Sequence, residues 1–256
     1  MDWNKKVVFI TGASSGIGGE LAIQLGARGA IFGLLARRRE MLDELSASIA
    51  QSGGTARIFA ADVTDEKAVH DAAGALREEF GKIDLLIANA GIGGGAVDPK
   101  DLNAENFTRV VNVNLIGAVN AVSAVLPNMI EQRSGQLVAI SSLAAYRGLP
   151  KSASYCASKA GMSALFESLR VDLHDFGVSV TTIHPGFIKT PLTSGRDAKM
   201  PFLMELPEAT AKIIRIIEQK KKIAAFPFPL STLVRFGQIF PAGLYDYIAR
   251  RNSYRE

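Results

Sequence analysis

A tyrosine and a lysine four residues apart form a pair that could transfer a proton. Tyr155 and Lys159 lie in a stretch with helical character, so both side chains should project from one helix face. A phenol with a pKa of about 10 is a poor acid–base group at neutral pH, but a nearby ammonium stabilises the phenolate. The pair predicts a proton donor to a carbonyl oxygen, or a base toward an alcohol. The alternative is that both residues merely lie on a helix surface.

A serine supplies a second hydroxyl at a place where α/β proteins bind ligands. Ser142 follows the apolar run Leu137–Ile140 and Ser141, which is typical of a buried strand. Open parallel sheets bind ligands at the carboxyl ends of their strands. Ser142 is therefore a candidate ligand-binding residue, although a serine there could instead cap the next turn.

A glycine-rich segment, Thr11–Gly18, follows the first apolar run and opens the first amphipathic stretch. Glycines let the backbone turn tightly and approach a ligand, and a helix N-terminus favours an anion such as pyrophosphate. This order of strand, turn and helix predicts a dinucleotide site. The residues that would form it are Gly12, Ser14, Ser15, Gly16, Ile17 and Gly18.

The same segment also matches the nucleophile elbow of α/β hydrolases, with Ser14 as the nucleophile and Asp175 and His184 as partners. A hydrolase takes part of its oxyanion hole from an earlier strand–helix loop. Only eleven residues precede Gly12, which leaves no room for that loop. The nucleotide interpretation is therefore favoured over the hydrolase.

Arginines stand where folds that prefer NAD usually carry an acid, about 20 residues after the glycine turn. The sequence there reads Leu35-Ala36-Arg37-Arg38-Arg39. A guanidinium can bind the 2′-phosphate of NADP(H) through paired, charge-assisted hydrogen bonds, whereas an acid would repel it. NADP(H) is predicted as the cofactor, with Arg37 as the favoured ligand and Arg38 as a second. Alternatively, these arginines only begin an exposed helix.

Apolar runs alternate with longer amphipathic stretches over most of the chain, which predicts a parallel sheet covered by helices. The predicted strands lie near Val7–Ile10, Ile31–Ala36, Arg57–Ala61, Ile83–Asn89, Gln136–Ser141, Val178–His184 and Ile223–Phe226. The predicted helices span Ile17–Arg28, Glu40–Gln51, Glu66–Phe80, Ala104–Met129 and Ala153–Phe176. The expected fold is a doubly wound, mostly parallel α/β domain in three layers over residues 1–256, with a variable segment at 190–256.

Taken in order over about residues 5–190, these motifs resemble those of the short-chain dehydrogenase/reductase family. The matching elements are Thr11-Gly12-x-x-x-Gly16-x-Gly18, Asp62-Val63, Asn89-Ala90-Gly91, Asn114, Ser142, Tyr155-x-x-x-Lys159, and Pro185-Gly186 with Thr190. The resemblance implies a Rossmann-type fold and a nicotinamide-dependent oxidoreductase that interconverts a carbonyl and an alcohol.

The resemblance also implies a role for each matching residue. Tyr155 would be the acid/base, Ser142 would hydrogen-bond the substrate oxygen, and Lys159 would hold the nicotinamide ribose and lower the tyrosine pKa. Asn114 would anchor a water in a proton relay from Lys159 to solvent. The remaining residues would border the cofactor: Asp62 and Val63 its adenine, Asn89, Ala90 and Gly91 the region of the adenosine ribose, and Pro185, Gly186, Ile188 and Thr190 its carboxamide.

The C-terminal segment, where the resemblance stops, is apolar and aromatic. Residues Ile223–Ala249 carry only Arg235 and Asp246 as charges, and Arg250-Arg251 follow them. Prolines interrupt the segment and rule against one spanning helix. Three interpretations stay open: a subunit interface or core cover, a hydrophobic substrate lid, and a peripheral membrane patch with basic flanks.

Composition narrows the remaining possibilities. The 256 residues are 48% hydrophobic, with one cysteine and three separated histidines, which predicts neither a disulfide framework nor a metal site. The net charge of +4 comes from the C-terminal quarter, with 12 basic and 6 acidic residues from Lys189 onward. With no signal-peptide core and no uninterrupted membrane-spanning apolar run, the expected location is cytoplasmic, with peripheral membrane contact kept open.

These features together predict an NADP(H)-dependent enzyme that interconverts a ketone or aldehyde with an alcohol. The expected partner is a small carbonyl or alcohol substrate, for which the apolar C-terminal segment leaves a hydrophobic compound open, and no nucleic acid is expected. The family resemblance implies a homodimer or homotetramer assembled through helices near 104–130 and 153–176. The rival hypothesis is a non-catalytic NADP(H)-responsive binding protein, which would retain the site without turning over a substrate.

Overall fold

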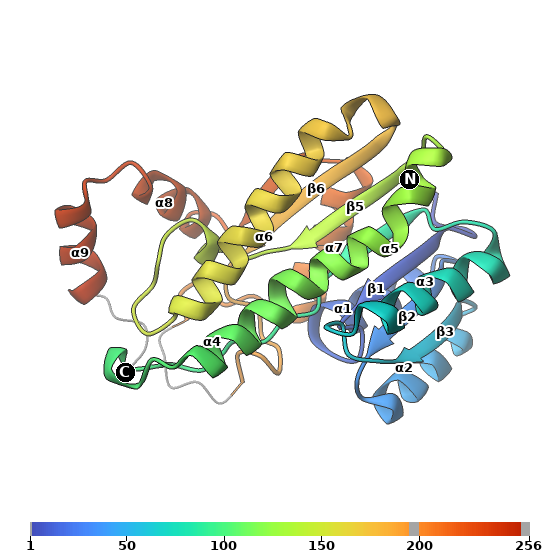
Figure 1. Cartoon of the computed structure of the whole chain (residues 1–256), viewed down its shortest axis with the longest axis horizontal. Coiled ribbons are helices and arrows are strands. Elements are labelled where there is room, and N and C mark those ends of the chain that lie inside the picture. Colours follow the sequence, from blue (N-terminus) through green and yellow to red (C-terminus); the bar gives the residue numbers. More distant parts are fainter. Residues whose placement is uncertain (1, 195–199, 252–256) are drawn as a thin grey trace.

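The fold is built on one parallel sheet of seven strands. The computed structural model describes residues 2–194 and 200–251 of the chain. The strands are β1 (Val7–Thr11), β2 (Ile31–Ala36), β3 (Thr55–Ala60), β4 (Leu85–Ala88), β5 (Gly135–Ile140), β6 (Val178–Pro185) and β7 (Ile223–Phe226). Their order is β3-β2-β1-β4-β5-β6-β7, and neighbouring strands pair in parallel throughout (Figure 1). The predicted doubly wound α/β fold is confirmed.

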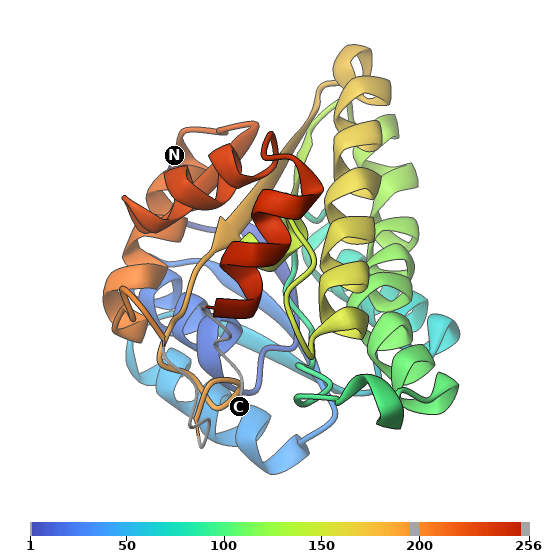
Figure 2. The same ribbon diagram turned by 90° about the vertical axis from the view of Figure 1, so that its left-hand side faces the viewer.

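Helices cover both faces of this sheet (Figure 2). One layer contains α1 (Gly16–Gly26), α2 (Arg39–Gln51) and α7 (Leu206–Glu218), and the other contains α3 (Glu66–Phe80), α4 (Ala104–Val111), α5 (Gly117–Glu131) and α6 (Ala153–Asp172). Two further helices, α8 (Leu230–Gly237) and α9 (Ala242–Arg251), follow β7. Short 3-10 turns occupy η1 (Pro99–Asp101), η3 (Leu143–Ala145) and η4 (His174–Phe176).

The first strand shows why the sheet is sandwiched. All five residues of β1 are buried. Successive strand side chains point to opposite faces, so Val8 and Ile10 join the core under α1, α2 and α7, while Val7 and Phe9 join the core under α3, α5 and α6. A strand buried on both faces is a continuous apolar run, which is typical of parallel sheets.

The predicted helix over Ala104–Met129 forms, but it is not regular. Its middle turn, η2 (Asn112–Ile116), is a π-helix between α4 and α5. The predicted strand boundaries also shift, since β3 begins at Thr55, two residues early, and β4 is confined to Leu85–Ala88. Periodicity locates a helix or strand well but reports poorly on its ends, which depend on tertiary hydrogen bonds.

Within the part of the chain that the structure describes, one helical run passes the length and hydropathy test for a membrane span. This run, Ala104–Glu131, has a mean hydropathy of 1.6 over its most apolar window, and 44% of that window is buried. The α5 part packs against α3 and β4 and supplies buried Ala121 and Val125 to the core. The run is therefore best understood as a core helix of the sheet's covering layer.

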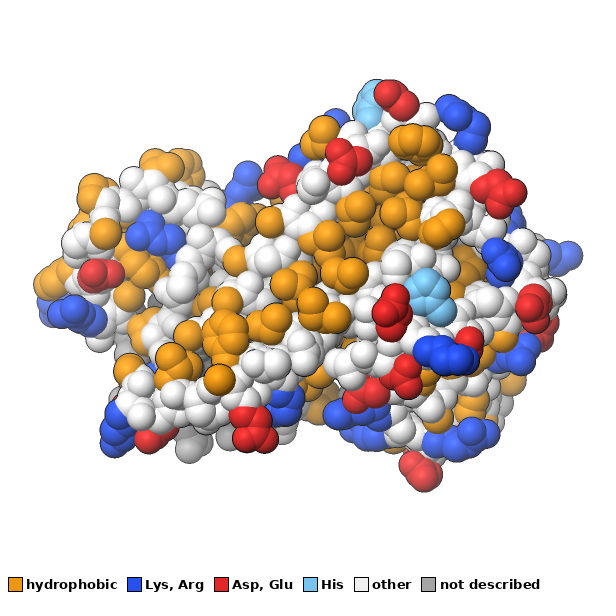
Figure 3. All heavy atoms as spheres, in the orientation of Figure 1, with side chains coloured by type: hydrophobic (Ala, Val, Ile, Leu, Met, Phe, Trp, Pro, Cys, Tyr) orange, Lys and Arg blue, Asp and Glu red, His pale blue; other side chains and the backbone are white. Residues whose placement is uncertain are grey.

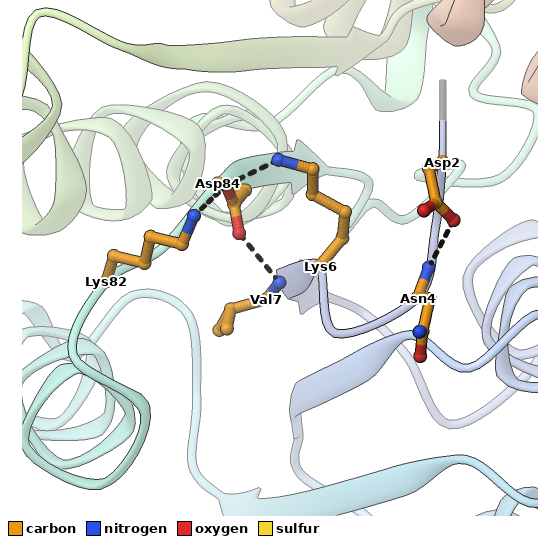
Figure 4. Close-up of polar contacts among 6 residues, drawn as sticks. All are labelled: Asp2, Asn4, Lys6, Val7, Lys82 and Asp84. Carbon is orange, nitrogen blue, oxygen red and sulfur yellow. Dashed lines mark hydrogen bonds and ion pairs between the residues drawn. The ribbon is translucent and has the colours of Figure 1, made fainter.

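A partly buried carboxylate, Asp84, binds groups at the amino end of the sheet. Asp84 Oδ2 accepts a hydrogen bond from the Val7 backbone N–H at 3.0 Å, while its Oδ1 lies 2.9 Å from Lys6 Nζ and 3.0 Å from Lys82 Nζ (Figure 4). Burial alone would raise the pKa of this carboxyl. The hydrogen bonds from Val7, Lys6 and Lys82 outweigh burial, so the pKa lies below its ordinary value.

We expect Asp84→Asn to lower the free energy of unfolding at pH 7 by about 2 kcal/mol, because the charged hydrogen bonds are lost. A depressed folded-state pKa stabilises above the unfolded value of 3.8, and the effect disappears as pH falls through the folded pKa. The difference in free energy of unfolding between wild type and variant, measured by urea unfolding, should therefore shrink below about pH 4. Asp71→Asn, which breaks only an exposed pair with Lys67, is the control and should change little. A pH-independent difference would contradict this assignment.

Candidate active site

A cavity of about 840 Å³ opens at the carboxyl edge of the sheet, where the strand order reverses between β1 and β4. Such switch points are where open α/β sheets bind ligands. Most residues singled out from the sequence line this cavity. They are Gly12, Ser14, Ser15, Gly16, Ile17, Arg37, Arg38, Asp62, Val63, Asn89, Ala90, Gly91, Ser142, Tyr155, Lys159, Pro185, Gly186, Ile188 and Thr190. Gly18 and Asn114 lie behind the lining.

The glycine turn is shaped for a close backbone approach. Gly12 has φ +68°, and a Cβ there would lie 2.6 Å from the Ala90 Cα, so no side chain fits. A Cβ on Gly18 would lie 2.6 Å from the Asn89 Nδ2, which explains why Gly18 packs the turn rather than lining the cavity. Asn89 Nδ2 in turn donates to the carbonyls of Thr11 and Gly12, each at 3.1 Å.

The two predicted phosphate ligands differ in their surroundings. Arg38 donates to the hydroxyls of Ser14 at 2.9 Å and Ser15 at 2.7 Å, so it lies directly on the glycine turn. Arg37 faces Asp62, with 3.7 Å between Nη1 and Oδ2. The sequence favoured Arg37, whereas the contacts bring Arg38 closer to the residues that approach a pyrophosphate. Both guanidiniums border the same end of the cavity.

The geometry around Ser14 does not support the hydrolase alternative, in which this serine is the nucleophile. Ser14 contacts Arg38 rather than a histidine. His184 is buried on β6, stacks on Tyr146 with 4.6 Å between ring centroids, and lies 3.1 Å from the Ser163 Oγ. Burial lowers the pKa of His184 to about 4. This histidine therefore packs as a neutral core residue, away from the glycine turn.

Lys159 is a buried ammonium in the middle of the site. It is 3% exposed, and its Nζ donates to the Ile140 carbonyl at 2.9 Å. Burial disfavours the charged form and lowers the pKa of Lys159 to about 8. The group is thus still mostly protonated at neutral pH, and its charge is poorly screened by water.

Ser142 and Tyr155 line the same cavity as Lys159 and come from two different parts of the chain. Ser142 lies two residues after the end of β5 and is the N-cap of η3, where its Oγ accepts the Ala144 N–H at 3.1 Å. Because one lone pair is used in this way, the hydroxyl proton remains available to a ligand oxygen. Tyr155 lies one helical turn before Lys159 on α6, is half-buried, and borders the cavity beside Ser142.

Asn114 occupies the π-helical turn η2 and is fully buried. Its Oδ1 accepts the Ile92 N–H at 2.7 Å, and its Nδ2 donates to the Ile92 carbonyl at 3.0 Å and the Ser158 Oγ at 2.9 Å. These contacts hold the chain just after Gly91, where a Cβ would meet both Asn114 Oδ1 and Lys159 Nζ within 3.4 Å. Asn114 therefore supports the site from behind, next to Lys159.

Arg147 is a cavity-lining residue that the sequence analysis missed. It lies in the loop between Ser142 and α6, borders the cavity, and donates to the carbonyls of Gly237 at 2.7 Å and of Gln238 and Phe240 at 3.2 Å. Its guanidinium also lies 4.1 Å from the centroid of the Tyr245 ring. This single cation joins the loop of the candidate active site to α8 and α9. No local pattern marks it, because all its partners lie about 90 residues away.

The far half of the cavity is apolar. It is bordered by residues of η3 and its loop and by the helices after β7: Leu143, Ala144, Leu149, Leu230, Leu233, Val234, Phe236, Phe240, Tyr245 and Ile248. The polar half is the part that fits a nicotinamide dinucleotide. It offers a side-chain-free glycine turn, two arginines at one end and a buried ammonium at the other.

Comparisons with known proteins agree with this geometry. Residues 6–201 match the model of the short chain dehydrogenase family. The chain is 41% identical to an uncharacterized oxidoreductase of Myxococcus xanthus, with 96% of this chain and 97% of that protein covered. It is 35% identical to a fatty acyl-CoA reductase of Acinetobacter baylyi, with 86% and 75% covered.

The fold is likewise similar to that of a solved xylitol dehydrogenase with NAD+ bound. The TM-score is 0.81 at 28% identity, over 89% of this chain and 99% of that one. The family match covers the glycine turn, Ser142, Tyr155 and Lys159 together. The chain thus belongs to the short-chain dehydrogenase/reductase family, and it is an oxidoreductase that acts on alcohol or carbonyl groups.

Proposed function

We propose that this protein is an NADP(H)-dependent reductase that interconverts a ketone or aldehyde with an alcohol, and that the substrate is lipophilic. The observation that carries the proposal is that Ser142, Tyr155 and the buried Lys159 line the same cavity as the glycine turn and the apolar residues of α8 and α9. The same residues would catalyse the reaction in either direction, with Tyr155 as the base toward an alcohol or as the acid toward a carbonyl.

In the reducing direction, Tyr155 donates its phenolic proton to the carbonyl oxygen while charge builds there. The Ser142 hydroxyl donates a hydrogen bond to the same oxygen, so both groups act where negative charge develops. The Lys159 ammonium stabilises the phenolate that Tyr155 becomes, and Asn114 holds the backbone beside Lys159 and would anchor a water in the reprotonation of the tyrosine. A bound nicotinamide dinucleotide supplies or accepts the hydride.

The cofactor preference rests on the arginines at the end of β2. Ala36 ends β2 and is followed in the chain by Arg37 and Arg38, not by an acid, and both arginines line the cavity. The similar xylitol dehydrogenase was solved with NAD+, so family membership alone does not choose between the two cofactors. The two guanidiniums and the Ser14 and Ser15 hydroxyls favour the 2′-phosphate of NADP(H).

We expect Arg38→Ala to weaken NADPH binding by about tenfold to a hundredfold and to leave NADH binding nearly unchanged, because only NADPH carries the 2′-phosphate that the guanidinium would bind. Arg37→Ala should also weaken NADPH binding, but by a smaller factor. Isothermal titration with both cofactors at fixed salt measures this. Arg39→Ala is the matched control, since Arg39 pairs weakly with Asp43 on the helix and does not line the cavity. Equal losses for NADH and NADPH would overturn the assignment.

The activity itself is tested with a panel of ketones and aldehydes of increasing chain length, following NADPH consumption. Turnover that rises with chain length supports the proposed function and the apolar chamber. Tight NADPH binding with no turnover of any compound would instead favour the non-catalytic, cofactor-responsive binding protein.

The remaining expectations belong to the same proposal. Residues 1–256 form one domain whose variable segment, 190–256, closes over the substrate. The protein is cytoplasmic and assembles as a homodimer or homotetramer through the face of α4, α5 and α6. Figure 3 shows hydrophobic side chains gathered over this face, which supports an assembly of that kind.

A further inference from the structure

The helices after β7 expose an unusual amount of apolar surface. The most exposed side chains are Phe228 (80%), Ile239 (76%), Leu233 (62%), Tyr247 (61%) and Phe236 (60%), with Leu244 and Ile248 beside them. All seven come from a segment of about 20 residues that forms α8, α9 and their connections. We call this set the α8–α9 patch. A few scattered apolar residues would be ordinary on a protein surface, but a contiguous cluster marks a contact site.

Each of these helices carries two neighbouring apolar faces. On α8, Leu230, Leu233, Val234 and Gly237 follow helical spacing and line the cavity, while Phe236 and the following Ile239 are among the exposed residues. On α9, Tyr245, Ile248 and Ala249 line the cavity, and Leu244 and Tyr247 point to solvent. Since Leu233, Phe236 and Ile248 belong to both sets, the outer surface continues into the apolar half of the cavity.

The two helices lie at the end of the molecule where the sheet's strands terminate. Figure 1 shows α8 and α9 projecting beyond the sheet at the left of the view, and Figure 2, which faces that end, shows them at the front. The opening of the cavity and the α8–α9 patch thus share one end. A surface that the patch contacts would lie directly outside the substrate chamber.

The charges beside the patch are mostly positive. Residues Phe228–Arg251 contain three basic residues, Arg235, Arg250 and Arg251, and one acidic residue, Asp246. All four side chains are exposed. Arg251 also donates to the Tyr247 hydroxyl at 2.8 Å, which places a guanidinium on the patch itself. Exposed apolar and aromatic side chains flanked by arginines are what an interfacial helix presents to anionic lipid.

We propose that the α8–α9 patch docks on an anionic bilayer surface and that its inner face passes a lipophilic substrate from the bilayer into the cavity. The docking stands on the exposed residues and their charges alone, whereas the passage of substrate rests on the proposed function. The helices lie on the membrane and do not cross it, since α8 and α9 are only 8 and 10 residues long.

A second copy of the chain fits the α8–α9 patch less well than an anionic bilayer does. A two-fold contact places the same patch on both subunits, so the arginines of one copy would approach those of the other. Like charges in such a contact are unfavourable, whereas anionic headgroups neutralise them. The hydrophobic face over α4, α5 and α6, seen in Figure 3, already offers a separate surface for assembly.

The docking is tested by co-sedimentation of the full chain with vesicles of phosphatidylcholine alone and of phosphatidylcholine with phosphatidylglycerol. We expect binding to the anionic vesicles that falls with salt. Phe228→Ser/Ile239→Ser should lower the partition coefficient by about tenfold or more, and Arg250→Gln/Arg251→Gln should remove most of the anionic preference. Phe228 and Ile239 do not line the cavity, so turnover of a short, water-soluble ketone should be unchanged.

Leu102→Ser/Val171→Ser is the matched control, because both residues are comparably exposed but lie on other elements, and vesicle binding should be unaffected. Failure of the wild type to bind anionic vesicles would overturn the proposal. A shift of Phe228→Ser/Ile239→Ser from dimer to monomer in light scattering, without loss of vesicle binding, would also overturn it and make the patch a subunit interface.

Passage of substrate is tested separately with a long-chain ketone supplied in anionic vesicles. The patch variant should turn it over at least about tenfold more slowly than the wild type, with the short ketone as the reference. If neither protein reduces any ketone while the wild type still binds vesicles, the proposed function fails and the docking stands. Equal rates on the vesicle-borne ketone would refute the passage.

Discussion

Tyr155→Phe should reduce kcat for ketone reduction by about a thousandfold while NADPH binding stays within about twofold of the wild type. The substitution removes only the hydroxyl, so the ring still packs at the cavity edge. What disappears is the proton that neutralises the developing oxyanion. Single-turnover assays with NADPH, paired with a binding titration, separate the chemical step from cofactor affinity.

Tyr146→Phe is the control for this experiment. Tyr146 lies nearby in the loop after Ser142, but its ring stacks on His184, and its buried hydroxyl has no hydrogen-bond partner among the described residues. Removing that hydroxyl should leave kcat unchanged. Retention of full activity by Tyr155→Phe would show that another group donates the proton, and the proposed roles of Ser142 and Lys159 would then have to be reassigned.

The second large effect is a loss of activity coupled to a gain in stability. Lys159→Met keeps an unbranched side chain that is one atom shorter, and it removes the charge. Without the ammonium, the phenolate of Tyr155 is no longer stabilised, so we expect kcat to fall by at least about a hundredfold. At the same time, the folded protein no longer has to bury a charge beside the sheet.

The size of the stability gain follows from the pKa of Lys159. Burial lowers it from 10.5 to about 8, which corresponds to about 3 kcal/mol at neutral pH. The hydrogen bond to the Ile140 carbonyl is lost in the variant, and its absence offsets about 1 kcal/mol. A net stabilisation of about 2 kcal/mol at pH 7 is therefore expected from urea unfolding.

The sign of the pH dependence provides a further check. Between about pH 8 and 10.5 the unfolded chain holds the Lys159 proton and the folded protein does not, so wild-type stability rises with pH in this window relative to Lys159→Met. The advantage of the variant should therefore shrink as pH increases from 8 toward 10. A variant that is less stable at pH 7, with a gap that does not depend on pH, would show that the ammonium is well compensated.

Much of the fold could be predicted because its signals are local. Strands buried on both faces appear as continuous apolar runs, as β1 does, and helices between them carry one apolar face. Part of the site could also be predicted from the sequence. Gly12 must turn where no side chain fits, and Tyr155 and Lys159 must share a helix face, and both requirements appear as residue types at fixed spacing.

Other features depend on contacts that no local pattern records. The π-helical turn around Asn114 interrupts a run whose periodicity is otherwise helical, and only its hydrogen bonds to Ile92 and Ser158 mark it. The order of preference between Arg37 and Arg38 changed because the chain folds Ser14 and Ser15 against Arg38. The role of residues 223–249 was left open among three interpretations for the same reason.

The contacts of Arg147 have a consequence for exchanging parts between relatives. If the segment after β7 were replaced by one from another member of the family, the guanidinium would lose three carbonyl acceptors and the Tyr245 ring. A cation without partners would then remain in the loop that carries Ser142 toward Tyr155. Arg147 and residues 230–251 therefore depend on each other. A chimera designed to accept a new substrate should take both from the same parent protein.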